Sequence, residues 1–420
     1  MSTTTRTPPD SKSNSALYFD YNATAPLCET AREHVISALS QTGNPASVHS
    51  HGRSARSTFE TARQQLASLL KAGRFDHIIF NSGGSEGNNT VIKTFQTPEM
   101  QKKNALTLIS AIEHPCVIES GFDGMGSNSK TTKVKTIPVD QYGIIDLNAV
   151  EETLKTHRQE YPDAPILVSC MLVNNETGVI QPLKQIIAIA KRYDAFVHSD
   201  IVQALGRIPF CVETYPVDYA TLSSHKIGGL TGFGALYIRA KTPYTPIILG
   251  GGQEKNRRSG TSNLSGAAAF TGALKEVCLE DWQPIQCLRD DLEAKIKDYC
   301  SDVIIWGQDA DRVANTSSIM MPGIDAFTQM VSFDLDGISI SAGSACSSGK
   351  VSPSHVLKAM GASDDQAMNT IRISLPKYTT QAMVDRFVNS WKKIYERCVS
   401  QNTSSTSQKT PNLMTKTVEG

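Results

Sequence analysis

The feature that most constrains the fold is the alternation of short apolar runs with helical patterns between residues 77 and 238. Buried strands are expected at 77–80, 105–112, 165–173, 195–200, 219–225 and 235–238. Between them, apolar residues recur at helical spacing, as at Leu183, Ile186, Ile187 and Ala190. Strand–helix alternation of this length predicts an α/β fold, with a mostly parallel central sheet and helices on both faces.

The pattern changes near residue 282, where a long charged helical segment, QCLRDDLEAKIKDYC, is followed by shorter elements. This change predicts a smaller α+β domain. Both chain ends are rich in Ser and Thr without apolar periodicity, and we expect them to be disordered. The predicted organisation is a tail at 1–16, an N-terminal segment of the small domain at 17–34, a large domain at 35–281, the small domain proper at 282–398 and a tail at 399–420.

Composition excludes several classes of function. The 41 Lys and Arg residues balance the 41 Asp and Glu residues, which argues against nucleic-acid binding through bulk positive charge. No apolar run approaches the length of about 18 residues that a membrane span needs, and no secretion signal is evident. The nine cysteines form no Cys-x-x-Cys pair, which favours reduced intracellular thiols. We therefore expect a cytoplasmic protein, with a mitochondrial location as the alternative because the first residues are rich in Ser and Thr.

A small-residue turn, Phe80 to Asn89, directly follows an expected strand and precedes a helix. Small residues such as Gly84 let backbone N–H groups approach an anion, and the hydroxyl of Ser85 adds a donor at a helix N-terminus. The turn matches neither a Walker loop nor a Gly-x-Gly-x-x-Gly fingerprint. An ordinary strand-to-helix turn is the commoner alternative.

Polar residues stand at the ends of two later strands. Asp200 ends the run AFVHSD and is followed by Gln203, while Lys226 follows the run YATLSSH. Ligands of open α/β sheets bind beyond the carboxyl ends of strands, although Asp200 could be a helix cap and Lys226 a solvated charge. Together, a lysine amine and a carboxylate are the pair that pyridoxal phosphate (PLP) needs, one for its aldehyde and one for its ring nitrogen.

Three further residues stand out. Cys346 lies in a run of small residues, SAGSACSSG, that cannot pack a core, so we expect an accessible thiol there, or else an incidental cysteine. Arg372 lies in the apolar stretch TIRIS, where a half-buried guanidinium needs an anion, either a structural Asp or a substrate carboxylate. His114 follows a strand and either stacks on a planar cofactor or terminates the strand.

Taken together, these segments resemble the cysteine desulfurases, which belong to the class V aminotransferase group of PLP enzymes with fold type I. The resemblance covers about residues 17–398. Its motifs are YFDYNATAP at 18–26, GNPASVH at 43–49, NNETG at 174–178, Ser-x-His-Lys at 223–226, RSGT at 258–261 and GSAC at 343–346.

The resemblance implies a role for each candidate. Lys226 would hold PLP covalently, Asp200 would pair with its ring nitrogen, and His114 would stack on the ring and assist catalysis. Gln203 would bond the phenolate oxygen, and Asn175 and Arg372 would hold the substrate carboxylate. The phosphate would be bound by Gly84, Ser85, Ser223, His225 and Thr261, the last from a second subunit.

The implied reaction removes sulfur from L-cysteine and leaves L-alanine and a persulfide on Cys346, in a homodimer that passes the sulfur to an acceptor protein for iron–sulfur cluster assembly or other sulfur transfer. No metal, membrane or nucleic acid is expected. Two positions differ from the family pattern: Leu230-Thr231 stands where a Pro-Lys pair is frequent, and the C-terminal tail is unlike that of members that dock an iron–sulfur scaffold.

Other functions remain as alternatives. A selenocysteine lyase or another class V enzyme would share the fold, and the reactive Cys346 favours cysteine as substrate. A nicotinamide oxidoreductase predicts a Gly-x-Gly-x-x-Gly motif that the chain lacks. A non-catalytic sulfur carrier predicts loss of Lys226 or Cys346, and both are present.

Overall fold

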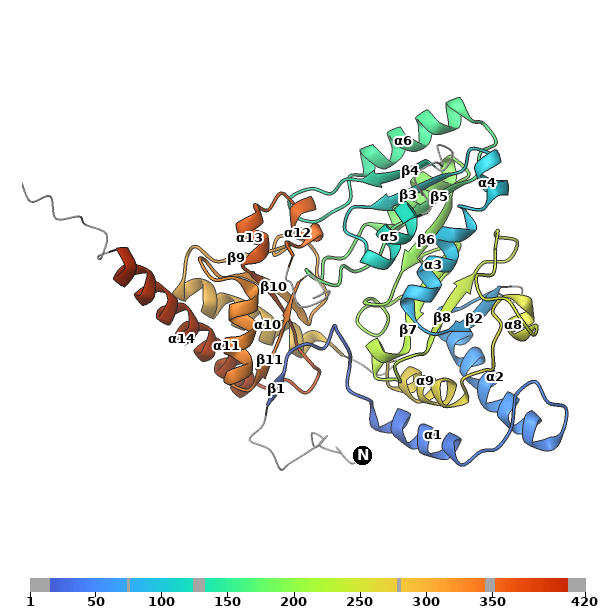
Figure 1. Ribbon diagram of the computed structural model, residues 1–420, viewed down its shortest axis with the longest axis horizontal. Helices are drawn as coiled ribbons and strands as arrows, with labels where there is room; N and C mark the ends of the chain where they lie inside the picture. Colours follow the sequence, from blue (N-terminus) through green and yellow to red (C-terminus); the bar gives the residue numbers. More distant parts are fainter. Residues whose placement is uncertain (1–15, 74–75, 124–132, 278–280, 344–351, 407–420) are drawn as a thin grey trace, which may run out of the picture.

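The computed structural model describes residues 16–73, 76–123, 133–277, 281–343 and 352–406, with side chains as far as Arg397. This part of the chain forms two lobes that lie side by side (Figure 1). The large lobe is built on a seven-stranded sheet in the order β2-β8-β7-β6-β5-β3-β4. Its strands are β2 (His77–Asn81), β3 (Leu106–Ser110), β4 (Lys133–Ile137), β5 (Ile166–Ser169), β6 (Phe196–Asp200), β7 (Tyr219–Ser223) and β8 (Gly234–Ile238). Each predicted apolar run overlaps one of these strands, β4 was not predicted, and the predicted α/β fold class is confirmed.

The direction of the strands decides where a ligand can bind. Strand β8 runs antiparallel to β2 and β7, whereas β4, β3, β5, β6 and β7 pair in parallel. The carboxyl ends of these parallel strands therefore meet at one edge of the sheet, where open α/β sheets bind their ligands. Asp200 and Ser223, the last residues of β6 and β7, lie at this edge.

Helices cover both faces of this sheet. On one face lie α3 (Gly84–Thr94) and α5 (Pro115–Asp123), and on the other lie α2 (Ser50–Leu70), α6 (Leu147–Glu160), α7 (Leu183–Arg192) and α9 (Leu264–Val277). Strand β2 shows the consequence: Ile78 and Phe80 pack in the cluster that contains α2, while Ile79 packs in the cluster that contains α3. Because both faces are covered, the central strands β3, β5, β6 and β7 are buried at nearly every position, whereas β4 at the end of the sheet keeps exposed residues.

The small lobe contains a four-stranded antiparallel sheet, β12-β13-β10-β9, and a two-stranded parallel sheet, β1-β11. The strands are β1 (Leu17–Tyr18), β9 (Ile304–Ile305), β10 (Thr316–Met320), β11 (Ile338–Ser339), β12 (Ser341–Ala342) and β13 (Thr370–Ser374). The helices are α10 (Gln283–Tyr299), α11 (Ala326–Leu335), α12 (His355–Ala359), α13 (Asp364–Met368) and α14 (Gln381–Thr406). Their core includes Phe333 stacked on Phe387 at a ring distance of 4.9 Å and the fully buried Trp391.

The N-terminal segment crosses from one lobe to the other. Strand β1 pairs with β11 in the small lobe, whereas α1 (Glu29–Leu39) packs closely against α9 in the large lobe (Figure 1). At the other end, α14 continues past the predicted start of the tail at 399 to Thr406. The division of the chain into domains at the predicted boundaries stays a prediction.

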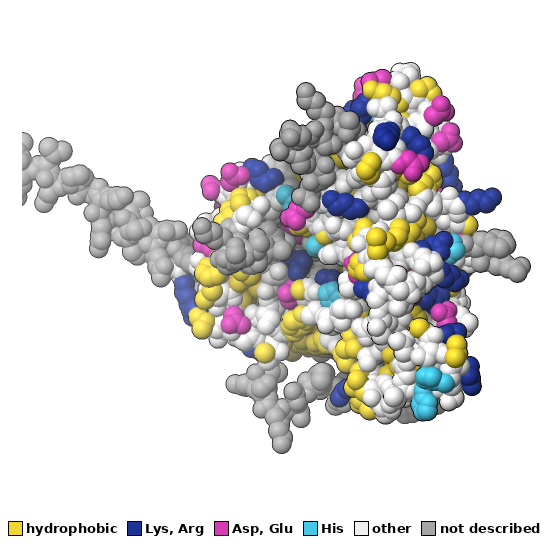
Figure 2. All heavy atoms as spheres, turned by 45° about the vertical axis from the view of Figure 1, so that its right-hand side comes forward, with side chains coloured by type: hydrophobic (Ala, Val, Ile, Leu, Met, Phe, Trp, Pro, Cys, Tyr) yellow, Lys and Arg dark blue, Asp and Glu magenta, His cyan; other side chains and the backbone are white. Residues whose placement is uncertain are grey.

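Charges of both signs are distributed over the visible face of the molecule (Figure 2). Within the described ranges, no helix has the length and apolar character needed to cross a membrane. The same residues contain no group of three or more His, Cys, Asp or Glu side chains that could hold a metal ion. His49 instead caps helix α2, with its ring accepting a hydrogen bond from the N–H of Gly52 at 3.2 Å.

Candidate active site

A buried amine marks the centre of the site. Lys226 lies in a short 3₁₀ helix, η1 (Ser224–Ile227), which directly follows β7 and ends at Gly228, whose φ of 86° suits glycine. Its Nζ donates hydrogen bonds to the main-chain oxygens of Asn22 at 2.7 Å and Ala23 at 2.8 Å. Burial first, and then the charge of Arg372, lower the pKa of Lys226 to about 7. A sizeable fraction of this amine is therefore neutral and nucleophilic near neutral pH.

Asp200 is a carboxylate held by fixed donors and is 7% exposed. Its Oδ1 accepts the N–H of Val202 at 2.9 Å, and its Oδ2 accepts the side-chain amide of Asn88 at 2.7 Å. Asp200 is among the charges that raise the pKa of Lys226, so the strand-end carboxylate and the amine act on each other electrostatically. The structure thus brings together the two residues that the sequence paired.

His114 forms the start of helix α5. Its main-chain oxygen accepts the N–H of Val117 at 2.8 Å, and its ring Nδ1 accepts the N–H of Cys116 at 3.2 Å. Burial lowers the pKa of His114, and the charge of Asp200 acts in the opposite direction. Since the same pKa also responds to Lys226, the imidazole belongs to the same electrostatic environment as the other two groups.

The predicted phosphate-binding residues surround the small-residue turn. Gly83 precedes α3 with a φ of 148°, and a Cβ placed on it would lie 3.7 Å from the Oγ of Ser223. Gly84 and Ser85 are the first residues of α3, whose free N–H groups favour an anion. The ring Nδ1 of His225 and the Oγ1 of Thr24 share a hydrogen bond of 3.1 Å. Burial first, and then the charge of Lys226, lower the pKa of His225 to about 4.

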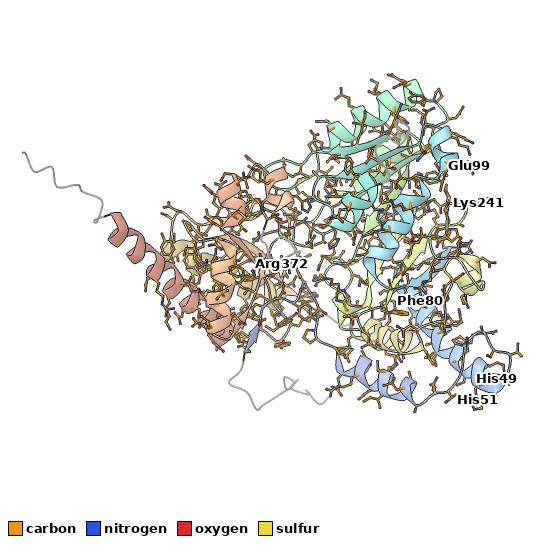
Figure 3. All side chains as sticks on the ribbon, in the orientation of Figure 1. His49, His51, Phe80, Glu99, Lys241 and Arg372 are labelled. Carbon is orange, nitrogen blue, oxygen red and sulfur yellow. The ribbon has the colours of Figure 1, made fainter. Side chains whose placement is uncertain are left out.

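Arg372 lies in β13, on the side of the small lobe toward the large one (Figure 3). It is 6% exposed, and its Nη2 donates to Asp20 Oδ1 at 2.7 Å while its Nη1 donates to the main-chain oxygen of Asn175 at 3.1 Å. The sequence left open whether Arg372 pairs with a structural Asp or with a substrate carboxylate, and the structure shows a structural partner, Asp20. The Nε of Arg372 is buried and has no partner among the described residues, so the guanidinium keeps a donor for a further anion.

Asn22 links the two lobes at the site, a role that the sequence did not assign. Its Nδ2 donates to Thr316 Oγ1 at 2.9 Å, and its Oδ1 accepts from Asn315 at 3.2 Å and from Arg207 at 3.3 Å. Its main-chain oxygen also accepts the side chain of Gln203 at 3.0 Å. The motif YFDYNATAP was the available signal, because a polar Asp and Asn within a buried segment need partners.

One predicted residue lies apart from this cluster, and another falls outside the part of the chain that the structure describes. Thr261 is exposed in the single chain, and no described contact joins it to Lys226. The neighbouring Arg258 pairs with Glu86 of the phosphate turn at 3.0 Å, which fixes the RSGT segment next to that turn. Cys346 lies outside the described residues.

The described residues next to Cys346 contact a buried acid that the sequence did not single out. Glu176 is 3% exposed, and its Oε2 accepts the hydroxyl of Ser354 at 2.5 Å. A Cβ added to Gly343 would lie only 2.7 Å from the same oxygen. Burial raises the pKa of Glu176. One carboxyl group therefore bonds Ser354 on one side of the segment that carries Cys346 and lies close to Gly343 on the other, where a larger residue would collide with it.

The residues present fit PLP by their chemistry. The buried amine with a lowered pKa suits its aldehyde, the fixed carboxylate suits its ring nitrogen, and the helix N-terminus suits its phosphate. The Oε1 of Gln203 is also buried without a partner among the described residues, as expected for a side chain whose environment is completed by a ligand.

Comparisons with known proteins agree with this geometry. The family model for class V aminotransferases matches residues 17–387, and this chain belongs to that family. It is 34% identical over 392 residues to the cysteine desulfurase IscS of Dictyoglomus turgidum, covering 91% of this chain and 95% of that protein. Among solved structures, a NifS-like protein from Rickettsia africae superposes with a TM-score of 0.81 at 36% identity, covering 91% of this chain and all of that one. The structure of SspA in complex with cysteine superposes with a TM-score of 0.74 at 29% identity, covering 87% of this chain and 100% of that one.

Proposed function

We propose that this chain is a PLP-dependent cysteine desulfurase, which converts L-cysteine to L-alanine and leaves a persulfide on Cys346. The observation that carries the proposal is the buried Lys226 amine, whose lowered pKa of about 7 is combined with the fixed carboxylate of Asp200. Similarity to proteins named cysteine desulfurase over about nine tenths of the chain supports the choice among class V reactions.

The cofactor would be held by residues of both strand ends and of the small-residue turn. Lys226 would bind its aldehyde, Asp200 its ring nitrogen, Gln203 its phenolate oxygen, and His114 one face of its ring. Its phosphate would be bound by Gly84, Ser85, Ser223, His225 and, from a partner subunit of a homodimer, Thr261. When bound, PLP supplies the electron sink that allows the Cα–H bond of an amino acid to break.

The remaining steps depend on side chains of this chain. Arg372, kept in place by Asp20, would orient the substrate carboxylate with its free Nε, and Asn175 would assist. The Nζ of Lys226 would take up the Cα proton, since its lowered pKa makes it an effective base near pH 7. Cys346 would attack the substrate sulfur as a thiolate.

Atoms and electrons balance without an outside oxidant. The C–S bond of L-cysteine breaks as an S–S bond forms to Cys346, and the electron pair of the C–S bond stays with the carbon part. The former Cβ then takes up one proton and Cα regains the proton that Lys226 removed, which gives L-alanine. The persulfide then needs an acceptor protein, for iron–sulfur cluster assembly or another sulfur transfer. A cytoplasmic location, with a mitochondrial one as the alternative, is part of the same proposal.

Borohydride reduction tests the cofactor assignment. The holoprotein should be yellow, and reduction should bleach the visible band and leave the cofactor covalently attached to the peptide that contains Lys226. Lys226→Ala should bind PLP without covalent trapping. A colourless protein that PLP cannot reconstitute, or a label on another lysine, would contradict the proposal.

The sulfur acceptor is tested by Cys346→Ser, which should retain the PLP absorbance and its change on adding L-cysteine but form no persulfide. Cys287→Ser, which removes an exposed thiol of the small lobe, is the matched control and should behave as wild type. Wild-type persulfide formation by Cys346→Ser would assign the acceptor role to another thiol. Selenocysteine in place of cysteine tests the substrate, and a faster reaction with it would favour the lyase alternative.

A further inference from the structure

A second cysteine, Cys116, lies within the candidate site and has no role in the proposed reaction. Its Sγ is 3.0 Å from His114 Nδ1 and 3.3 Å from the side-chain amide nitrogen of Asn88. The same amide nitrogen donates to Asp200 Oδ2 at 2.7 Å. A continuous set of contacts therefore runs from the carboxylate through an amide and a thiol to the imidazole.

The direction of each hydrogen bond follows from the donors present. The amide of Asn88 carries two hydrogens, one directed to Asp200 Oδ2 and the other available to the sulfur. The main-chain N–H of Cys116 donates to His114 Nδ1, so this ring nitrogen is an acceptor and carries no proton. The side chain of Ser85 also forms a hydrogen bond with Cys116 and lowers its pKa, as a donor to the sulfur does, so the thiol hydrogen is directed to His114, where it shares the single Nδ1 lone pair with the main-chain N–H.

We propose that Cys116 is a positioning residue, whose thiol holds the His114 imidazole in the neutral form with its proton on Nε2 and links it through Asn88 to Asp200. Asn88 is completely buried, so water does not compete for these bonds. Burial raises the pKa of Cys116 to about 12, which keeps the thiol protonated and able to donate. This inference concerns the apoprotein as well, but its consequence for catalysis rests on the proposed function.

The charged groups around the imidazole come from several elements. Asp200 at the end of β6 and Glu119 in α5 raise the pKa of His114, whereas Lys226 in η1 and His355 in α12 lower it. The N-terminus of α5 also disfavours a positive charge on the ring. The thiol adds one donor to the neutral form only, and its loss should therefore raise the pKa of His114.

The consequence is a limit on what His114 can do. A neutral ring with Nδ1 already accepting two hydrogens can lie against a cofactor ring and donate from Nε2, but it does not take a proton at Nδ1. The Cα proton of the substrate is therefore left to Lys226. Asp200 would support a positive charge on the ring nitrogen of bound PLP, and an imidazolium at His114 would add a second cation to the same site.

Three variants separate hydrogen bonding from packing. Cys116→Ser keeps a donor in a smaller side chain, Cys116→Val keeps volume without a donor, and Cys116→Ala removes both. Each is labelled with ¹⁵N in its nine histidines, as holoprotein and apoprotein, and the ring nitrogens are followed by NMR against pH. His114→Gln identifies the His114 signals, and the other eight histidines report whether each variant is folded.

We expect the wild type and Cys116→Ser to show an unprotonated Nδ1 and a protonated Nε2. In Cys116→Val and Cys116→Ala the titration midpoint of His114 should rise by about half to one pH unit, as expected for the loss of one neutral hydrogen bond. The low-pH midpoint of the pH–rate profile for alanine formation should shift upward by the same amount in these two variants. A proton on Nδ1 in the wild type, or a wild-type midpoint in Cys116→Val, would overturn the proposal. If the wild-type holoprotein itself forms no alanine from L-cysteine while the ring signals behave as expected, the desulfurase assignment fails and the positioning role of Cys116 stands.

Discussion

The bonds of the Asn22 side chain provide a quantitative test of how the two lobes are joined. Asn22→Ala removes bonds to Thr316, Asn315 and Arg207 and a longer one, 3.4 Å, to the main-chain oxygen of Asn175. Asn22 is 2% exposed, so its former partners cannot turn to bulk water. At about 1 kcal/mol for each neutral bond, and more for the one from a charged guanidinium, the expected loss of unfolding free energy is about 4 kcal/mol.

Tryptophan fluorescence during urea unfolding is a suitable assay because Trp282, Trp306 and Trp391 all pack in clusters that contain small-lobe residues. The matched control is Asn148→Ala, the same substitution at an exposed position in α6, which should change the unfolding free energy by less than about 0.5 kcal/mol. A loss below about 1 kcal/mol in Asn22→Ala, with the control unchanged, would refute the view that these bonds join the lobes.

Three further outcomes are expected. Covalent uptake of PLP by the apoprotein should accelerate about tenfold per pH unit below pH 7 and level off above it, because the neutral fraction of Lys226 rises through its pKa of about 7; a rate that keeps rising to pH 10 would contradict this. Arg372→Lys should raise the KM for cysteine by about 10–100-fold while the PLP absorbance is retained, because a lysine ammonium cannot replace the paired N–H donors of the guanidinium. An unchanged KM would remove Arg372 from the site. Ser354→Ala removes the N-cap of α12 and the hydrogen-bond donor to Glu176, and it should lower the unfolding free energy measured by urea titration by about 2 kcal/mol. Ser354→Thr, which keeps a hydroxyl, should recover most of that loss. Equal unfolding free energies of the wild type and Ser354→Ala would contradict the role of the hydroxyl.

The fold was predictable because its strongest signal is local. A strand covered on both faces is largely apolar, as in β5, where Ile166, Leu167 and Val168 precede the buried Ser169, and such runs stand out between helical patterns. Lys226 and Asp200 were predictable for a related reason, since the ends of neighbouring parallel strands meet. Helix α14 shows the limit of composition, because its Ser- and Thr-rich end continues as helix to Thr406.

The partners within the site were not predictable because they are distant in sequence. Arg372 pairs with Asp20, 352 positions away, and no local pattern in the stretch TIRIS identifies that partner. Cys116 was counted among nine similar thiols, and only the fold shows that it contacts both His114 and Asn88. Sequence patterns locate reactive groups, whereas the neighbours that set their protonation follow from tertiary packing.

The crossing of residues 17–28 between the lobes also sets the order in which a newly synthesised chain can become active. Asp20 and Asn22 are synthesised near the start of the chain, whereas their partners Arg372 and Thr316 follow 352 and 294 positions later. Lys226 therefore emerges long before the guanidinium that would hold a substrate. A nascent or truncated chain that ends before β13 lacks Arg372, and with it the guanidinium proposed to hold the substrate, even where its amine is in place.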